Sequence, residues 1–201
     1  MSEPVDTSVF GAFMQLLAIK RRPNRKWRSQ ELGAQNKIEI RYIKDTDDRF
    51  AISRIYEESW RFAYKDIVPK SYLDSIPSGK WAAHLDNTDM HTLVALENNK
   101  LMGTASYCKS RFCDFADFGE IVSIYFLPEY MGQGYGTKLL KVVVDELAKL
   151  GYHDIFLWVL EANTRARVFY EKAGFIFSNK FLVDNIGGQE LREVQYCCHI
   201  E

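Results

Sequence analysis

Apolar residues follow two different periods along this chain, and each period predicts a type of element. Residues 38–42 alternate apolar and charged side chains, which is the two-residue period of a strand with one buried face. Between residues 137 and 150, leucine and valine recur every three or four positions with charged side chains opposite, which predicts an amphipathic helix. Both patterns are typical of a folded domain with a core.

Carried along the chain, the same reading predicts the order β, α, α, β, β, β, α, β, α, β, β. Asn98 and Asn99 separate two apolar runs and predict a tight hairpin, and Asn163 is placed to cap a short helix that ends at Gly174. The predicted elements are strand 38–42, a helix capped by residues 45–48, a short helix near 71–73, strands 93–96, 101–108 and 120–127, helix 137–150, strand 155–160, helix 163–174, and strands 175–183 and 191–199. This order indicates an α/β (α+β) domain, with a mixed central sheet of about six to seven strands flanked by about four helices.

The first 36 residues differ from the rest of the chain. They carry six basic and three acidic residues, so their net charge is +3 and that of residues 37–201 is −4. We interpret residues 1–36 as a basic appendage, partly helical around residues 10–20 or flexible, and residues 37–201 as the folded domain. An arm, a targeting segment and a misassigned start remain alternatives. The basic run at 20–28 is more typical of a solvated tail than of a nucleic-acid site.

Composition excludes several classes of function. The chain has 201 residues, 47% of them hydrophobic, and a net charge of −1, which disfavours nucleic-acid binding. No apolar run reaches the roughly 18–20 residues of a membrane span. The four cysteines (108, 113, 197 and 198) and the four histidines show no metal-site spacing. We therefore expect no metal, reduced cysteines and a cytoplasmic location.

Gly132, Gly134 and Gly136 form a glycine-rich turn between a predicted strand and the predicted helix at 137–150. Glycine permits a tight turn and a close approach of ligand to backbone, and the free amides at a helix N-terminus attract anions. The Rossmann spacing fails because Thr137 replaces its third glycine, and the P-loop ending is absent. The turn therefore predicts a phosphate site of another type, with a purely structural turn as the alternative.

Two segments carry a specific resemblance. Residues 120–140, EIVSIYFLPEYMGQGYGTKLL, resemble the acetyl-CoA signature of the GCN5-related N-acetyltransferase (GNAT) family, and residues 163–175, NTRARVFYEKAGF, resemble its second signature. The resemblance covers about residues 37–201 and implies an acyl-CoA N-acyltransferase fold with acetyl-CoA as cosubstrate. It implies that the strand at 120–127 separates from its neighbour so that pantetheine enters the gap, with the Phe126 N–H near the thioester carbonyl. The residues it assigns to the cofactor are Ile124, Tyr125, Phe126, Gly132, Gln133, Gly134, Tyr135, Gly136, Thr137 and Asn163.

The family pattern is not matched at every position. Met131 stands where the family usually has Gln or Arg, so we expect weaker cofactor binding. Asn163 is also explained as a helix cap. In members that acetylate ribosomal-protein N termini, a Leu-Glu-Val strand supplies a base, but here it reads Leu157-Trp158-Val159. That replacement argues against copying their mechanism.

Acetyl transfer to an amine needs a neutral amine, a stabilised oxyanion and a proton for the departing thiolate. The resemblance implies Tyr170 as the acid, with a core tyrosine as the alternative. It implies Glu120 as the base, directly or through water, with a solvated carboxylate beside Asp114 and Asp117 as the alternative. Four aromatic residues in the predicted first helices are candidates for the acceptor site or for simple core packing: Trp60, Phe62, Tyr64 and Tyr72.

The resulting hypothesis is an N-acetyltransferase that moves the acetyl group of acetyl-CoA to a primary amine of a small molecule, by direct attack in a ternary complex. Protein N-terminal or lysine acetylation is an alternative within the class. A non-catalytic acyl-CoA sensor and a nucleotide-binding module are alternatives outside it. No nucleic acid or membrane span is expected, and the resemblance is compatible with a homodimer formed through the last strands.

Overall fold

The computed structural model describes residues 38–201, so the predicted appendage at 1–36 lies outside the described residues. The described part has the predicted order of strands and helices. The strands are β1 (Ile38–Tyr42), β2 (His91–Glu97), β3 (Lys100–Lys109), β4 (Gly119–Phe126), β5 (Asp154–Leu160), β6 (Ile176–Ile186) and β7 (Gln189–His199). The α-helices are α1 (Arg49–Ala63), α2 (Lys70–Ser75), α3 (Tyr135–Lys149) and α4 (Thr164–Lys172). The prediction of a mixed sheet with helices around it is confirmed, and no helix within 38–201 is long and apolar enough to cross a membrane.

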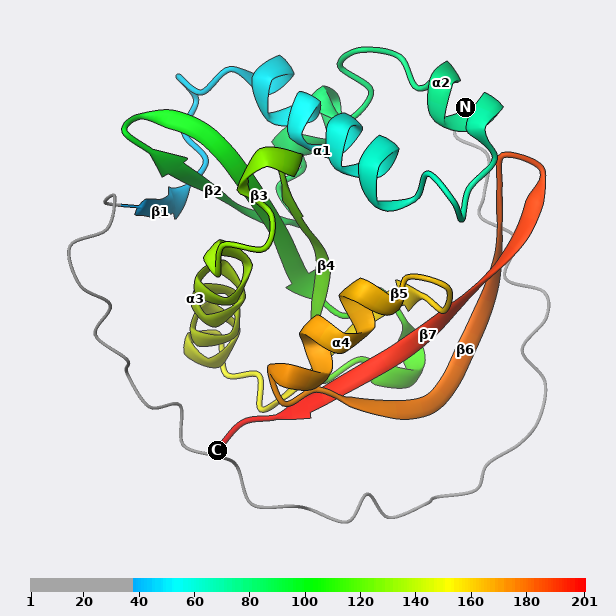
Figure 1. Cartoon of the computed structure of the whole chain (residues 1–201). Helices are drawn as coiled ribbons and strands as arrows, with labels where there is room; N and C mark the ends of the chain where they lie inside the picture. Colours follow the sequence, from blue (N-terminus) through cyan, green and yellow to red (C-terminus); the bar gives the residue numbers. More distant parts are fainter. Residues whose placement is uncertain (1–37) are drawn as a thin grey trace, which may run out of the picture.

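The strands form one sheet in the order β1-β2-β3-β4-β5-β7-β6 (Figure 1). Every neighbouring pair is antiparallel except β4 and β5, which are parallel and joined through α3. The predicted hairpin at Asn98 and Asn99 is confirmed, since both residues have positive φ as a two-residue turn requires. The β6–β7 hairpin extends further than predicted because Gly187 and Gly188, also at positive φ, turn the chain within two residues.

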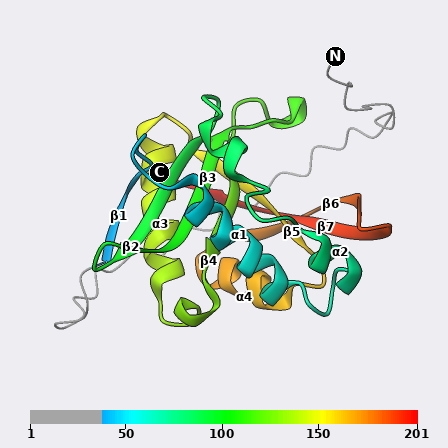
Figure 2. The same cartoon turned by 90° about the horizontal axis from the view of Figure 1, so that it is seen from above.

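Helices α1 and α3 cover opposite faces of the sheet (Figures 1 and 2). Alternate residues of β2 show this: Leu93 and Ala95 belong to the core with α3, whereas Val94 and Leu96 pack with α1. The side-chain period of two places each set on its own face. The buried leucines and valines of α3 confirm the amphipathic helix, although it begins at Tyr135, two residues earlier than predicted.

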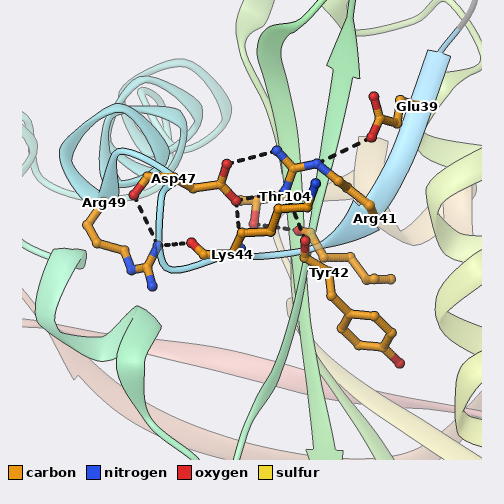
Figure 3. Close-up of polar contacts among 8 residues, drawn as sticks. Glu39, Arg41, Tyr42, Lys44, Asp47, Arg49 and Thr104 are labelled. Carbon is orange, nitrogen blue, oxygen red and sulfur yellow. Dashed lines mark hydrogen bonds and ion pairs between the residues drawn. The ribbon is translucent and has the colours of Figure 1, made fainter.

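An ion pair holds the loop that leads from β1 into α1 (Figure 3). Arg41 donates two hydrogen bonds to the carboxylate of Asp47, at 2.7 and 2.8 Å, and the backbone N–H of Lys44 donates a third. These bonds favour the charged carboxylate and lower its pKa to about 2. The next residue, Asp48, accepts from the first-turn amides of α1, as the predicted cap requires.

Candidate active site

Strands β4 and β5 separate soon after they begin to pair. Their parallel register covers only Gly119–Ile121 of β4, and the rest of β4 is bonded to β3 alone. One edge of β4 is therefore free of a strand partner from residue 122 to residue 126. This matches the gap between strands that the sequence resemblance implied.

The β3–β4 register identifies which backbone groups face the open edge. The Leu127 N–H donates to the Met102 carbonyl at 2.9 Å, and hydrogen-bonded pairs alternate along an antiparallel ladder. Tyr125 therefore directs its main-chain groups toward β3, whereas Ile124 and Phe126 direct theirs to the open edge. Of the three residues predicted to bond pantetheine through the backbone, Ile124 and Phe126 have suitably directed groups.

The Phe126 carbonyl already has a partner on α1. Ser59 is buried and donates its hydroxyl to this oxygen at 2.5 Å. The Phe126 N–H belongs to the preceding peptide unit and faces the open edge, where β5 no longer pairs with β4. The donor that was predicted to bind the oxyanion is therefore directed into the gap between the strands.

The glycine loop (residues 132–137) presents a run of unpaired amides. Gly132 and Gly134 take φ of +79° and +84°, and Gly134 is the N-cap of α3 without a side-chain cap. None of the amides in the loop donates a hydrogen bond within the described part of the chain. A Cβ on Gly132 or Gly134 would meet nothing within 4 Å, so the space beside the loop is open. Such a loop fits an anion, and a pyrophosphate in particular.

The other residues singled out in the two signatures have different surroundings in the structure. Gly136 is inside the first turn of α3, where a Cβ would contact the Phe169 ring at 3.5 Å. Gln133 donates to the Glu129 carbonyl at 2.6 Å, which braces the loop. Met131 packs against the core instead of reaching into the loop. Asn163 is confirmed as the cap of α4, since it accepts from the Ala166 N–H at 3.1 Å, and its cofactor contact stays a prediction.

A tyrosine cluster (Tyr64, Tyr125 and Tyr170) brings together α1, β4 and α4. Burial raises the pKa of all three phenols, that of Tyr125 to about 12, and each lies close enough to affect another. Trp60 donates its indole N–H to the Tyr125 hydroxyl at 3.1 Å. The Tyr170 hydroxyl has no hydrogen-bond partner within residues 38–201, unlike a satisfied core tyrosine. Its raised pKa keeps the phenol protonated at neutral pH, as a proton donor must be.

Glu120 is buried, not solvated. It is 1% exposed and accepts three hydrogen bonds from Arg111: from the backbone N–H at 3.0 Å, from Nε at 3.1 Å and from Nη2 at 2.6 Å. The alternative of a solvated strand-end carboxylate is therefore wrong, because the β3–β4 loop folds over it. Its role as base stays a prediction, and both of its oxygens are engaged by Arg111.

Of the four candidate aromatic residues, Tyr64 belongs to the tyrosine cluster and Trp60 lies beside it. Trp60 is in the last turn of α1 and Tyr64 is the C-cap residue of that helix, and their ring centroids are 5.0 Å apart. Phe62 points away, is 42% exposed and lies under the guanidinium of Arg165. Tyr72 packs where the β6–β7 hairpin turns at Gly187. On α1, the helical period places Phe62 on a different face from Trp60 and Tyr64.

Sequence reasoning missed Glu193 on β7. This carboxylate is partly buried, and its pKa is raised by burial first and by the charge of Asp184 second, with Arg111 acting in the opposite direction. It forms no hydrogen bond or ion pair within the described residues, and its charge reaches Tyr64 and Tyr125. The available signal was weak: Glu193 lies two positions after Leu191 and two before Gln195, so a charged residue shares a strand face with two buried residues.

The cysteines and the potential metal ligands of the described residues do not form a further site. All four cysteines are free thiols. Among residues 38–201, no group of three or more metal-binding side chains converges. Trp158 offers no carboxylate, and its buried indole N–H has no partner there.

Comparisons with known proteins identify the family that this chain resembles. Residues 50–175 match the model of the acetyltransferase (GNAT) family. An uncharacterized N-acetyltransferase of Bacillus subtilis, YuaI, is 29% identical over 147 residues, which cover 71% of this chain and 83% of that protein. A spermidine N(1)-acetyltransferase of Thermoplasma acidophilum is 26% identical over 147 residues, which cover 69% of this chain and 88% of that protein.

A solved structure shares the fold. YncA of Salmonella typhimurium, a putative acetyltransferase solved with its cofactor acetyl-CoA, aligns with a TM-score of 0.64 and 22% identity. The alignment covers 82% of this chain and 95% of that one.

Proposed function

The chain belongs to the GNAT family of acetyltransferases, an acetyl-CoA-dependent class of enzymes, and on that premise we propose that its acceptor is a primary amine of a small molecule. One observation carries the proposal. The open edge of β4 leads directly into the glycine loop, so one stretch of backbone offers donors for pantetheine and then for pyrophosphate. Side chains able to receive an amine and a thiolate lie beside that stretch.

Each step of the transfer has a candidate group in this chain. Acetyl-CoA supplies an acyl group activated as a thioester. The open-edge donors of Ile124 and Phe126 orient it, and the Phe126 N–H stabilises the oxyanion that forms when the amine attacks. Tyr170 donates its proton to the departing sulfur. In water, proton transfer from a phenol of pKa about 10 to a thiolate whose thiol has a pKa of about 8.5 is slightly uphill, and a hydrogen bond between the two groups makes it workable.

The proposed class of acceptor rests on the candidate base and on the aromatic residues beside Tyr125. An alkylamine has a pKa of about 10.4 in water and must lose a proton before it attacks. Glu120 is our candidate base, and this role requires Arg111 to release part of its hold on the carboxylate. The aromatic residues Trp60 and Tyr64 suit a small cationic amine. The spermidine acetyltransferase among the relatives supports the same class of acceptor.

The proposal is tested by binding first and turnover second. Calorimetry with acetyl-CoA should show binding, and thiol release should then depend on one of a panel of alkylamines, amino sugars, amino-acid amides and peptides. Tyr170→Phe should leave acetyl-CoA binding unchanged and lower turnover by about 10²-fold or more, since it removes only the proton donor. Tyr152→Phe, a partly buried tyrosine at the end of α3, is the matched control.

Three outcomes would contradict the proposal. Release driven only by peptides would favour a protein acetyltransferase. Binding without release for every acceptor would favour a sensor. Equal turnover of the Tyr170 and Tyr152 variants would show that Tyr170 is not the acid.

A further inference from the structure

We propose that Glu193 on β7 binds a second, protonated amino group of the acceptor, distinct from the neutral amine that is acetylated, and so selects acceptors that carry a cation. The inference rests on the proposed function and names a specificity residue for the same site. It is carried by the position of this carboxylate, by its lack of a partner, and by the aromatic rings around it.

Strand register places Glu193 under α1 and α2. It pairs with Leu160 of β5, and both Leu160 and Leu191 belong to an apolar cluster that includes α2 residues. Trp60 and Tyr64 of α1 pack against this same cluster. Side chains of directly paired residues lie on the same face of a sheet, so the carboxylate lies on the face that carries this cluster, which α1 and α2 cover.

The charge of Glu193 is not neutralised within residues 38–201. Burial of a carboxylate is unfavourable unless the group is paired or hydrogen-bonded. Arg111 is the cation that lowers the pKa of Glu193, but its guanidinium already binds Glu120, with Nη2 2.6 Å from Oε1. Asp184 adds a like charge. A cation is the group that this position lacks, and a bound ammonium would supply it.

The rings around Glu193 favour the same ligand. Tyr64 and Tyr125 both lie within the electrostatic reach of the carboxylate, and Trp60 contacts both of these tyrosines. A carboxylate together with aromatic faces binds an alkylammonium better than it binds a neutral amine. Because Tyr125 also lies close to Tyr170, an acceptor anchored here by its ammonium group would lie on the same side of the site as the predicted acid.

The test compares Glu193→Gln with wild type on two kinds of acceptor. 1,4-Diaminobutane is cationic at neutral pH, whereas aniline is not. Glu193→Gln should lower kcat/KM for 1,4-diaminobutane by about 10–100-fold, mainly through KM, and change the aniline rate and acetyl-CoA binding by less than about threefold. Glu190→Gln removes an exposed negative charge from the same strand and is the matched control, expected to behave as wild type.

The outcomes separate this inference from the proposed function. Equal behaviour of the Glu193 and Glu190 variants would overturn the inference while leaving acetyl transfer intact. An equal loss on both acceptors would overturn it too, since that pattern indicates a structural role. If wild type acetylates neither amine, binding of 1,4-diaminobutane to the CoA complex is measured instead. Binding that is lost in Glu193→Gln would then uphold the inference although the proposed function fails, and no binding would overturn both.

Discussion

Substitution of Gly134 by alanine should separate the role of the glycine loop in folding from its role in binding. Gly134 has φ of +84°, and a Cβ there would meet nothing within 4 Å. The folding penalty therefore comes only from the left-handed backbone conformation, about 1–2 kcal/mol for an L-residue. Gly151, after α3, has φ of +88° and equally open surroundings, so Gly151→Ala should lose the same stability.

The two variants should differ in CoA affinity. At Gly134 the new methyl group projects beside unpaired amides. A bound pyrophosphate would have to shift away from the methyl group and would lose hydrogen bonds from these amides. Loss of one hydrogen bond to a charged group corresponds to about 1.5–3 kcal/mol, which is roughly a 10–100-fold rise in Kd. Gly151→Ala should leave the Kd unchanged.

Calorimetry with two ligands makes the comparison sharp. CoA should distinguish the variants, whereas pantetheine, which lacks the pyrophosphate, should bind both alike. Urea unfolding reports the shared loss of stability. Equal CoA affinity for Gly134→Ala, Gly151→Ala and wild type would refute the assignment of a pyrophosphate site to this loop.

Two further predictions concern groups that support the site. Asp47→Asn should lower the free energy of unfolding at pH 7 by at most about 2 kcal/mol, because the ion pair with Arg41 lowers the Asp47 pKa from 3.8 to about 2. This contribution is present above the unfolded-state pKa and is lost as pH falls through the native-state pKa. Urea unfolding should therefore show that the difference in stability between wild type and Asp47→Asn shrinks between pH 4 and pH 2. A constant difference would contradict the prediction. Gly103→Ala would place a Cβ 2.4 Å from the Phe126 ring, so overpacking should destabilise the fold by about 1–3 kcal/mol and lower turnover as Phe126 shifts. Wild-type stability and turnover would show that this contact does not position Phe126.

Local features of the site could be predicted from the sequence. Alternate glycines in the turn before α3 need positive φ or close approach, and both depend on a few consecutive residues. The cap at Asn163 and the hairpin at Asn98 depend on neighbours within four positions. For the same reason the order of elements was correct. The ends of α3 and of the last hairpin moved by a few residues because capping and turn geometry, not periodicity, decide where a helix or strand stops.

Interactions between distant segments were the part that the sequence left open. Glu120 and Glu193 both look like ordinary charged residues in strands. The β3–β4 loop buries Glu120 and pairs it with Arg111, whereas register with β5 leaves Glu193 partly buried among aromatic rings. The properties of these two carboxylates depend on which groups the fold brings near them.

The sequence by itself determined the element order and the glycine loop, because short-range backbone and side-chain preferences encode them, and its resemblance to a known family pointed to Tyr170 as the candidate acid. Only the tertiary structure decided that β4 leaves β5 after three paired residues, and that Ile124 and Phe126 face the open edge. It also decided which carboxylate has no partner within residues 38–201. Strand register and burial set these features, and both arise from contacts between residues that lie tens of positions apart.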